Sequence, residues 1–181
     1  MMNRREQEMV TDQTFRDLMA GVCAPVTVVT AADEGIPYGT TVSAFASLSL
    51  RPPMVTVALD RASSLLERVR RTGRFGVNVL GHGQDADALV FAKRGVDRFA
   101  SVEWRFETGL PRLVGAPGWI ACDLAQEIEG GDHILLLGAV TDAETRVAAP
   151  LVYGHRAFGT HSHYAERPRR AVTDAITACS R

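Results

Sequence analysis

The sequence predicts a mostly β, largely antiparallel fold with about three short helices. Short runs of β-branched and apolar residues recur along the chain, and several alternate between apolar and polar positions as half-buried strands do. Helical patterns are few and short. Strand and helix patterns do not alternate regularly, which argues against a parallel sheet with crossover helices. The length of 181 residues suits one such domain.

A helix is predicted first, at residues 11–20. Thr11 or Asp12 can cap its free N–H groups, and Gly21 can end it. The pattern then changes to β-branched runs, which are typical of strands. These strands are predicted at residues 25–30, 38–50, 54–60 and 74–80, with two further helices at residues 65–73 and 84–94.

The second half predicts two long strands around a glycine turn. Residues 119–129 alternate apolar and acidic side chains, and residues 133–140 form a continuous apolar run. Gly130-Gly131 supplies a two-residue hairpin turn between them. A last short strand is predicted at residues 150–158. We therefore expect a flexible leader over residues 1–10, one domain over 11–162, and a partly disordered tail over 163–181.

Charge and composition exclude several functions. The chain has 20 basic and 21 acidic residues, whereas nucleic-acid binders more often carry a basic excess. No run approaches the roughly 20 apolar residues that span a bilayer. The charged start lacks the apolar core of a signal peptide, so a cytoplasmic location without membrane contact is expected. The three cysteines show no metal-ligand spacing, and no metal site is expected, although His161 and His163 form an H-x-H pair.

The segment 39–53 is the most informative for function. Two threonines and three serines crowd one predicted strand, which stops at Pro52-Pro53. Hydroxyls and free backbone N–H groups can hold a phosphate or the edge of a flavin ring without a cage of charges. On composition alone, a polar edge strand that faces water accounts for the same pattern.

This segment, together with residues 54–64, resembles the short-chain flavin reductase family. These proteins are the NAD(P)H-dependent reductase components of two-component flavin monooxygenases. Further pieces match in the family's order: RFGVNVL at 74–80, FAKRGVDRF at 91–99, GDHI at 131–134 and PLVY at 150–153. The resemblance covers about residues 13–160. It implies a six- to seven-stranded antiparallel Greek-key split β-barrel of the FMN-binding type, and a homodimer with flavin near the subunit interface.

The resemblance also implies two neighbouring binding sites. Hydroxyls of residues 40–47 would contact the flavin phosphates or ribityl chain, backbone groups of 57–59 would face the isoalloxazine, and residues 91–94 would contact phosphate or adenine. A helix starting after residues 63–64 could present N–H groups to a phosphate. The residues implied to bind flavin are Thr40, Thr41, Val42, Ser43, Ser47, Val57, Ala58, Leu59, Ser63, Ser64, Phe91, Lys93 and Arg94.

His133 in the GDHI piece is implied to hold the nicotinamide, with Tyr153 and Arg156 lining the same cleft. Without the resemblance, a histidine that begins a strand after a turn is simply a solvated residue. Tyrosine on a strand is likewise more often a packing residue.

The implied function is transfer of hydride from NADH or NADPH to FAD or FMN. The cofactors carry this reaction, so no catalytic protein group is obligatory. Reduced flavin would then serve a partner monooxygenase in aromatic catabolism or secondary metabolism. Two alternatives stay open: an oxidase with its own substrate, similar to pyridoxamine-phosphate oxidase, or a flavin- or haem-binding module. The sequence does not choose between the two flavins or between the two nicotinamides.

Overall fold

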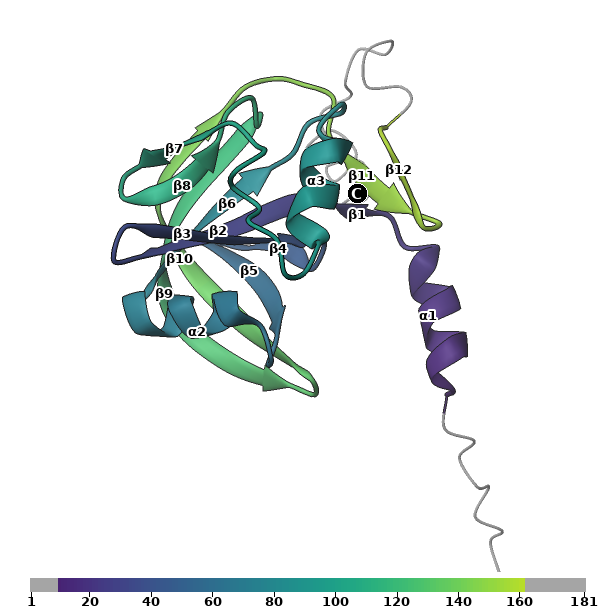
Figure 1. Cartoon of the computed structure of the whole chain (residues 1–181). Coiled ribbons are helices and arrows are strands. Elements are labelled where there is room, and N and C mark those ends of the chain that lie inside the picture. The colour runs from purple at the N-terminus through teal and green to yellow at the C-terminus, as the bar shows by residue number, and fades with distance from the viewer. Residues whose placement is uncertain (1–9, 162–181) are drawn as a thin grey trace, which may run out of the picture.

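The computed structural model describes residues 10–161, and a seven-stranded antiparallel sheet forms its centre (Figure 1). The strand order in this sheet is β3-β2-β6-β9-β10-β5-β4. A small sheet β1-β11-β12 and a hairpin β7-β8 accompany it. The helices are α1 (Asp12–Ala20), α2 (Ser64–Thr72) and α3 (Asp85–Ala92). The strands are β1 (Ala24–Pro25), β2 (Thr27–Asp33), β3 (Ile36–Val42), β4 (Phe45–Leu50), β5 (Pro53–Asp60), β6 (Arg74–Val79), β7 (Trp104–Glu107), β8 (Leu110–Leu113), β9 (Gly118–Gly130), β10 (His133–Thr145), β11 (Val152–Gly154) and β12 (Ala157–Gly159).

The main sheet curls into a barrel because its two edge strands are consecutive in the chain. Only Ser43 and Ala44 separate β3 from β4, although these strands lie at opposite ends of the strand order. Within residues 10–161, β3 pairs with β2 and β4 pairs with β5, and no ladder joins the two edges. The barrel therefore stays open along one seam. The predicted mostly β, antiparallel fold is confirmed.

Apolar side chains from alternate strand positions fill the inside of the barrel. Val29, Val57, Phe75, Val77 and Leu136 are completely buried there. Helix α2 adds three buried apolar side chains to the same core. Each such burial stabilises the fold by about 1.5–3 kcal/mol before the loss of conformational entropy is counted.

Helix α2 is held in place by a nearly buried carboxylate. Asp33 ends β2 with only 7% of its side chain exposed, and it forms ion pairs with Arg68 (3.5 Å) and Arg71 of α2. The Arg68 guanidinium also lies over the Tyr38 ring, 4.9 Å from its centroid. A buried carboxylate needs such partners, because an unpaired one is costly. Gly73 ends the helix with φ 69°, as the sequence predicts.

Two predicted strands are each divided in the structure. The segment 38–50 is split at Ser43-Ala44 between β3 and β4, because the chain crosses the seam there. The segment 150–158 is not one strand but the hairpin of β11 and β12, which turns at His155 and Arg156. Both turn residues have positive φ (49° and 60°), a conformation that composition does not signal for these residue types.

Two turns also differ from the sequence expectation. The β9–β10 hairpin pairs Gly130 with His133, so its two-residue turn is Gly131-Asp132, one residue later than predicted. Gly131 takes φ 64°, which suits glycine. The hairpin of β7 and β8 lies in a stretch that shows no clear strand pattern in the sequence, since its exposed side chains include both Arg105 and Phe106.

Helix α1 projects away from the barrel (Figure 1), and none of its residues is buried. The Oγ1 of Thr11 accepts a hydrogen bond from the Thr14 N–H (3.1 Å), so the predicted cap is confirmed. Phe15, Leu18 and Met19 leave an apolar face in contact with solvent. None of the helices described is long and apolar enough to cross a membrane. The predicted leader (except Val10) and the predicted tail lie outside the described residues.

The close approach of Gly76 to Trp119 predicts a large effect of one methyl group. A Cβ at Gly76 would lie 2.4 Å from Cη2 of Trp119 and 2.7 Å from Oγ1 of Thr30. We expect Gly76→Ala to lower the free energy of unfolding by about 1–3 kcal/mol, because the buried indole has to move. Urea denaturation measures this. Gly159→Ala is the control, since nothing lies within 4 Å of its added Cβ; equal stability of the two variants would contradict the packing.

Candidate functional site

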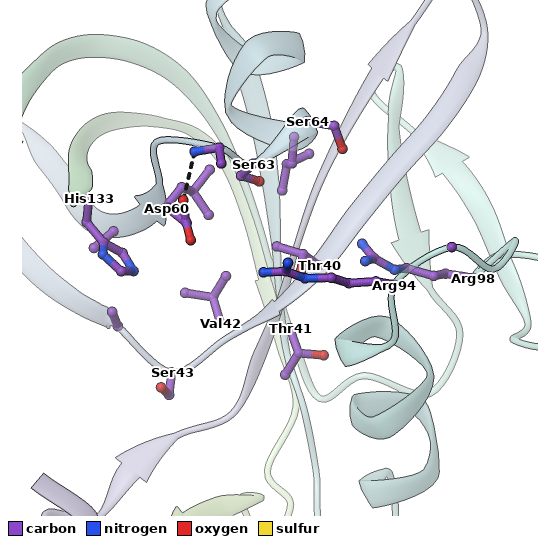
Figure 2. Close-up of a pocket in the computed structure, with 16 residues that line it drawn as sticks. Thr40, Thr41, Val42, Ser43, Asp60, Ser63, Ser64, Arg94, Arg98 and His133 are labelled. Carbon is purple, nitrogen blue, oxygen red and sulfur yellow. Dashed lines mark hydrogen bonds between the residues drawn. The ribbon is translucent and has the colours of Figure 1, made fainter. Parts of the chain in front are cut away.

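A cleft of about 500 Å³ opens at the seam of the barrel (Figure 2). Its walls come from the end of β3, the end of β5 with the start of α2, the segment after α3, and the start of β10. Four parts of the chain that are distant in sequence thus meet, and the link of Ser43 and Ala44 continues the first of them. The predicted site residues that line this cleft are Thr40, Thr41, Val42, Ser43, Ala58, Leu59, Ser63, Ser64, Arg94 and His133.

The start of α2 offers N–H donors to the cleft. The backbone oxygen of Asp60 accepts from the Ser63 N–H (2.9 Å), and its carboxylate accepts from the Ala62 N–H (2.7 Å). This turn sets Ser63 as the N-cap, yet the Ser63 side chain makes no capping hydrogen bond. The first N–H groups of a helix have no partner within the helix and carry its positive dipole end. An anion in the cleft can therefore bind here.

Two arginines supply positive charge to the same region. Figure 2 shows Arg94 reaching from the segment after α3 towards the middle of the cleft, with Arg98 behind it. Arg98 donates to the backbone oxygens of Lys93 (2.8 Å) and Gly39, which fixes this segment on β3. Burial, with Arg94 nearby, lowers the pKa of Arg98, but an arginine stays charged at neutral pH. Asp60 is the one carboxylate among the residues that line the cleft.

The two threonines of β3 use their hydroxyl protons within the fold. Thr41 donates to the backbone oxygen of Ala88 (2.6 Å), and Thr40 donates to that of Phe91 (3.4 Å). These bonds tie β3 to α3. Each hydroxyl oxygen keeps lone pairs that accept hydrogen bonds. Ligand hydroxyls therefore suit Thr40 and Thr41 better than a phosphate, which at neutral pH chiefly accepts.

His133 forms the opposite end of the cleft from Arg94 (Figure 2). Its Nδ1 lies 2.8 Å from Oδ1 of Asp132, and this hydrogen bond to the imidazole lowers the pKa of the Asp132 carboxyl. A neutral imidazole that donates through Nδ1 to this carboxylate presents Nε2 as an acceptor. With its side chain 45% exposed, His133 can be reached by a ligand.

Four residues predicted to bind flavin lie outside the cleft. Val57 is completely buried and paired on both sides, with Phe45 of β4 and Leu136 of β10, so its backbone groups lie within the sheet. Phe91 is completely buried against the edge of another ring. Ser47 and Lys93 are exposed at positions beyond the cleft walls.

Tyr153 and Arg156 lie in a second groove of about 770 Å³, between α1, β4 and the β11–β12 hairpin. Arg156 donates to Asp17 of α1 (2.6 Å). Hydrogen bonds from Gln13 and then Arg156 lower the pKa of the Asp17 carboxyl. Within one chain, the predicted nicotinamide residues are thus divided between the cleft and this groove. The two cavities share three residues: Ser43, Ala44 and Ala58.

Sequence reasoning missed several residues of the cleft. Arg98 belongs to the FAKRGVDRF piece, so its charge beside Arg94 was a usable signal. Asp60 ends a predicted strand just before the serine pair, a position typical of polar site residues. The other four missed lining residues, which give no such chemical signal, are Ala44, Ala62, Leu65 and Gly95.

An antiparallel barrel with an open seam, lined by hydroxyls and by the free N–H groups of a helix start, suits a protein that binds a phosphate-bearing cofactor. Residues 19–162 match the family model described as flavin reductase like domain, so the chain belongs to the flavin reductase like family. The predicted resemblance is therefore confirmed.

Relatives and a solved structure agree with this assignment. The reductase component of 4-nitrophenol 4-monooxygenase/4-nitrocatechol 2-monooxygenase from Rhodococcus opacus is 37% identical over 145 residues, covering 80% of this chain and 78% of that protein. A flavin reductase (NADPH) from Lentzea aerocolonigenes is 39% identical over 153 residues, with 82% and 89% covered. The NADH:FAD oxidoreductase of Streptomyces globisporus, solved with NAD and FAD fragments, superimposes with a TM-score of 0.82 at 30% identity, covering 88% of this chain and 99% of that one. The predicted split-barrel fold is confirmed.

Proposed function

We propose that the protein is an NAD(P)H-dependent flavin reductase that passes reduced flavin to a partner monooxygenase. The observation that carries the proposal is the seam cleft, which has a positive, donor-rich end at Arg94 and α2 and a histidine end at His133. One elongated cleft can thus hold a flavin tail at one end and a nicotinamide near the other. The names of the relatives support this use: one is a monooxygenase reductase component, and another is a flavin reductase (NADPH).

The donor set of the cleft fits a flavin nucleotide. A phosphate needs donors and positive charge, which Arg94 and the uncapped N–H groups of α2 supply. A ribityl chain carries hydroxyls that can donate to Thr40 and Thr41. Small apolar side chains at Ala58 and elsewhere on the wall leave room for a flat ring.

The residues of the chain bind and orient, because the cofactors carry the chemistry. Bound flavin supplies the hydride acceptor, and reduced nicotinamide supplies the hydride. Arg94 and the start of α2 hold the phosphate end in place. The Nε2 acceptor of His133 suits the carboxamide N–H of a nicotinamide, which would orient that ring in the cleft. No side chain is required to exchange a proton.

The solved relative with NAD and FAD fragments supports FAD and NADH as the first pair to test. The name of the Rhodococcus relative, a monooxygenase reductase component, supports a partner monooxygenase. We propose that this partner acts in aromatic catabolism or secondary metabolism. The predicted cytoplasmic location, where reduced nicotinamide is made, stays a prediction.

The reaction itself gives the first test. We expect purified protein to oxidise NADH or NADPH, followed as loss of absorbance at 340 nm, only when FAD, FMN or riboflavin is present, because the flavin is the acceptor. Omission of flavin is the control. Flavin binding without any oxidation of either nicotinamide would contradict the proposal and favour an oxidase with its own substrate or a binding module.

Arg94 gives a test of the phosphate end. Arg94→Ala should weaken FMN binding about tenfold, the loss of one charge-assisted contact of roughly 1.5 kcal/mol, while riboflavin binding stays unchanged because it has no phosphate. Titration followed by flavin fluorescence measures both constants. Lys93→Ala is the matched control, since Lys93 is the adjacent cation outside the cleft. If Arg94→Ala weakens the binding of FMN and riboflavin equally, Arg94 does not contact the phosphate.

We also propose a homodimer formed across the α1 groove. The groove is lined by apolar side chains that a monomer would leave in contact with water, among them Phe15, Met19, Phe45 and Leu135. It adjoins the cleft through the residues that both cavities share. A second copy seated there would also bring its own α1 and hairpin near the seam.

A charge on the face of α1 should separate such a dimer. Phe15 is 57% exposed, so Phe15→Glu leaves the fold of one chain intact but buries a carboxylate in the interface. We expect the mass from light scattering to halve. Ile36→Glu, at a similarly exposed apolar side chain on β3 that does not line the groove, should stay dimeric. A wild-type monomer with full activity would overturn the dimer.

A further inference from the structure

Arg61 occupies an unusual position beside the cleft. Its neighbours Asp60 and Ala62 both line the cleft, but Arg61 does not. Its side chain instead turns to the β9–β10 hairpin, where Nε donates to the backbone oxygen of Gly131 (2.7 Å). Its backbone N–H donates to the oxygen of Asp132 (3.0 Å). One residue thus binds both successive carbonyls of a two-residue turn.

That turn leads directly into His133. Gly131 and Asp132 are exposed and contribute no apolar packing, so hydrogen bonds are what hold the tip of the hairpin. His133 lies opposite Asp60 in the β5–β10 ladder, and Arg61 extends this pairing by one step around the tip. The turn that carries Asp132 and precedes His133 is thus held partly by Arg61.

The loop that contains Arg61 also begins α2. Asp60 fixes Ala62 and Ser63 through the two hydrogen bonds described above, and Ser63 is the cap of the helix. Arg61 stands between the start of α2 and the turn before His133. Its side chain links the loop that begins α2 to the turn that precedes His133.

We propose that Arg61 is a positioning residue for nicotinamide binding, which acts by holding the Gly131-Asp132 turn so that His133 faces the cleft. This inference rests on the proposed flavin reductase function, and within it on the nicotinamide role of His133. The side-chain hydrogen bond from Nε to the Gly131 oxygen carries the effect, because the backbone N–H of residue 61 donates to Asp132 whatever its side chain. The ion pair of Arg61 with Glu129 is longer (3.5 Å), and Glu129 is 83% exposed, so it contributes little.

The chain offers a matched control. Arg70 of α2 binds Glu127 of β9 (2.8 Å) with its side chain 47% exposed, against 43% for Arg61. Arg70 lies outside the cleft. Arg70→Ala therefore removes an arginine contact to the same hairpin without touching the turn. Glu129→Gln removes only the ion pair of Arg61.

The first measurement needs no cofactor. Hydrogen–deuterium exchange of the cofactor-free protein should be faster in peptides covering residues 128–134 for Arg61→Ala, and unchanged there for Arg70→Ala and Glu129→Gln. Arg61→Lys should resemble Arg61→Ala, because an ammonium does not reproduce the Nε–H contact in this geometry. Unchanged exchange in Arg61→Ala would overturn the proposal.

The second measurement is a double-mutant cycle with His133→Ala. Each single variant should raise the KM for NADH by about five- to tenfold, with flavin affinity within about twofold of wild type. The double variant should be no worse than His133→Ala, because Arg61 acts through His133. If the double variant instead raises the KM by the product of the two single increases, Arg61 contacts the dinucleotide directly and the proposal is overturned.

The two single variants separate the two levels of inference. If His133→Ala raises the KM for NADH and Arg61→Ala does not, the positioning role is wrong while the nicotinamide role of His133 stands. If His133→Ala leaves the KM unchanged, the nicotinamide role fails, and the positioning role fails with it. If the wild-type protein shows no flavin-dependent oxidation of NADH or NADPH, the proposed function itself is wrong.

Discussion

Ser43 and Ala44 connect two strands that lie at opposite edges of one seven-stranded sheet, and this short link constrains everything around it. Two residues span only about 7 Å, so the sheet must curl until its edges approach. The edges nevertheless do not pair, and the seam between them is where the cleft opens. The start of α2, the segment with Arg94, and the first residue of β10 all reach this seam. The proposed cofactor site is thus a consequence of how the barrel closes.

The mostly β fold could be predicted because its signals are local. Alternating strands and the glycine that ends α2 depend on neighbouring residues alone. The break at Ser43-Ala44 could not, because the alternation of side chains runs through it without interruption. Only the closure of the barrel, a long-range event, decides that β3 ends there. The β11–β12 turn could not be predicted for another reason. His155 and Arg156 adopt positive φ, and the turn has neither the glycine nor the asparagine that usually marks this conformation.

The candidate site shows the same division between local and distant information. The family pieces assigned Arg94 and the serine pair to a flavin site and His133 to a neighbouring nicotinamide site, and the structure brings all of them to one cleft. Val57 and Phe91 also lie in matching pieces, but both are completely buried, because the packing of the elements decides which positions face the core. The positions of Tyr153 and Arg156 depend on where the β11–β12 hairpin packs against the barrel, and no local sequence pattern specifies this packing.

If the proposed dimer forms across the α1 groove, the three residues shared by the cleft and this groove connect ligand binding to subunit association. A ligand that orders Ser43, Ala44 and Ala58 from one side also shapes the surface on the other. By thermodynamic linkage, whatever free energy the ligand adds to subunit association must return as tighter ligand binding by the assembled form. The retention of flavin would then depend on protein concentration, and dilution alone would favour its release.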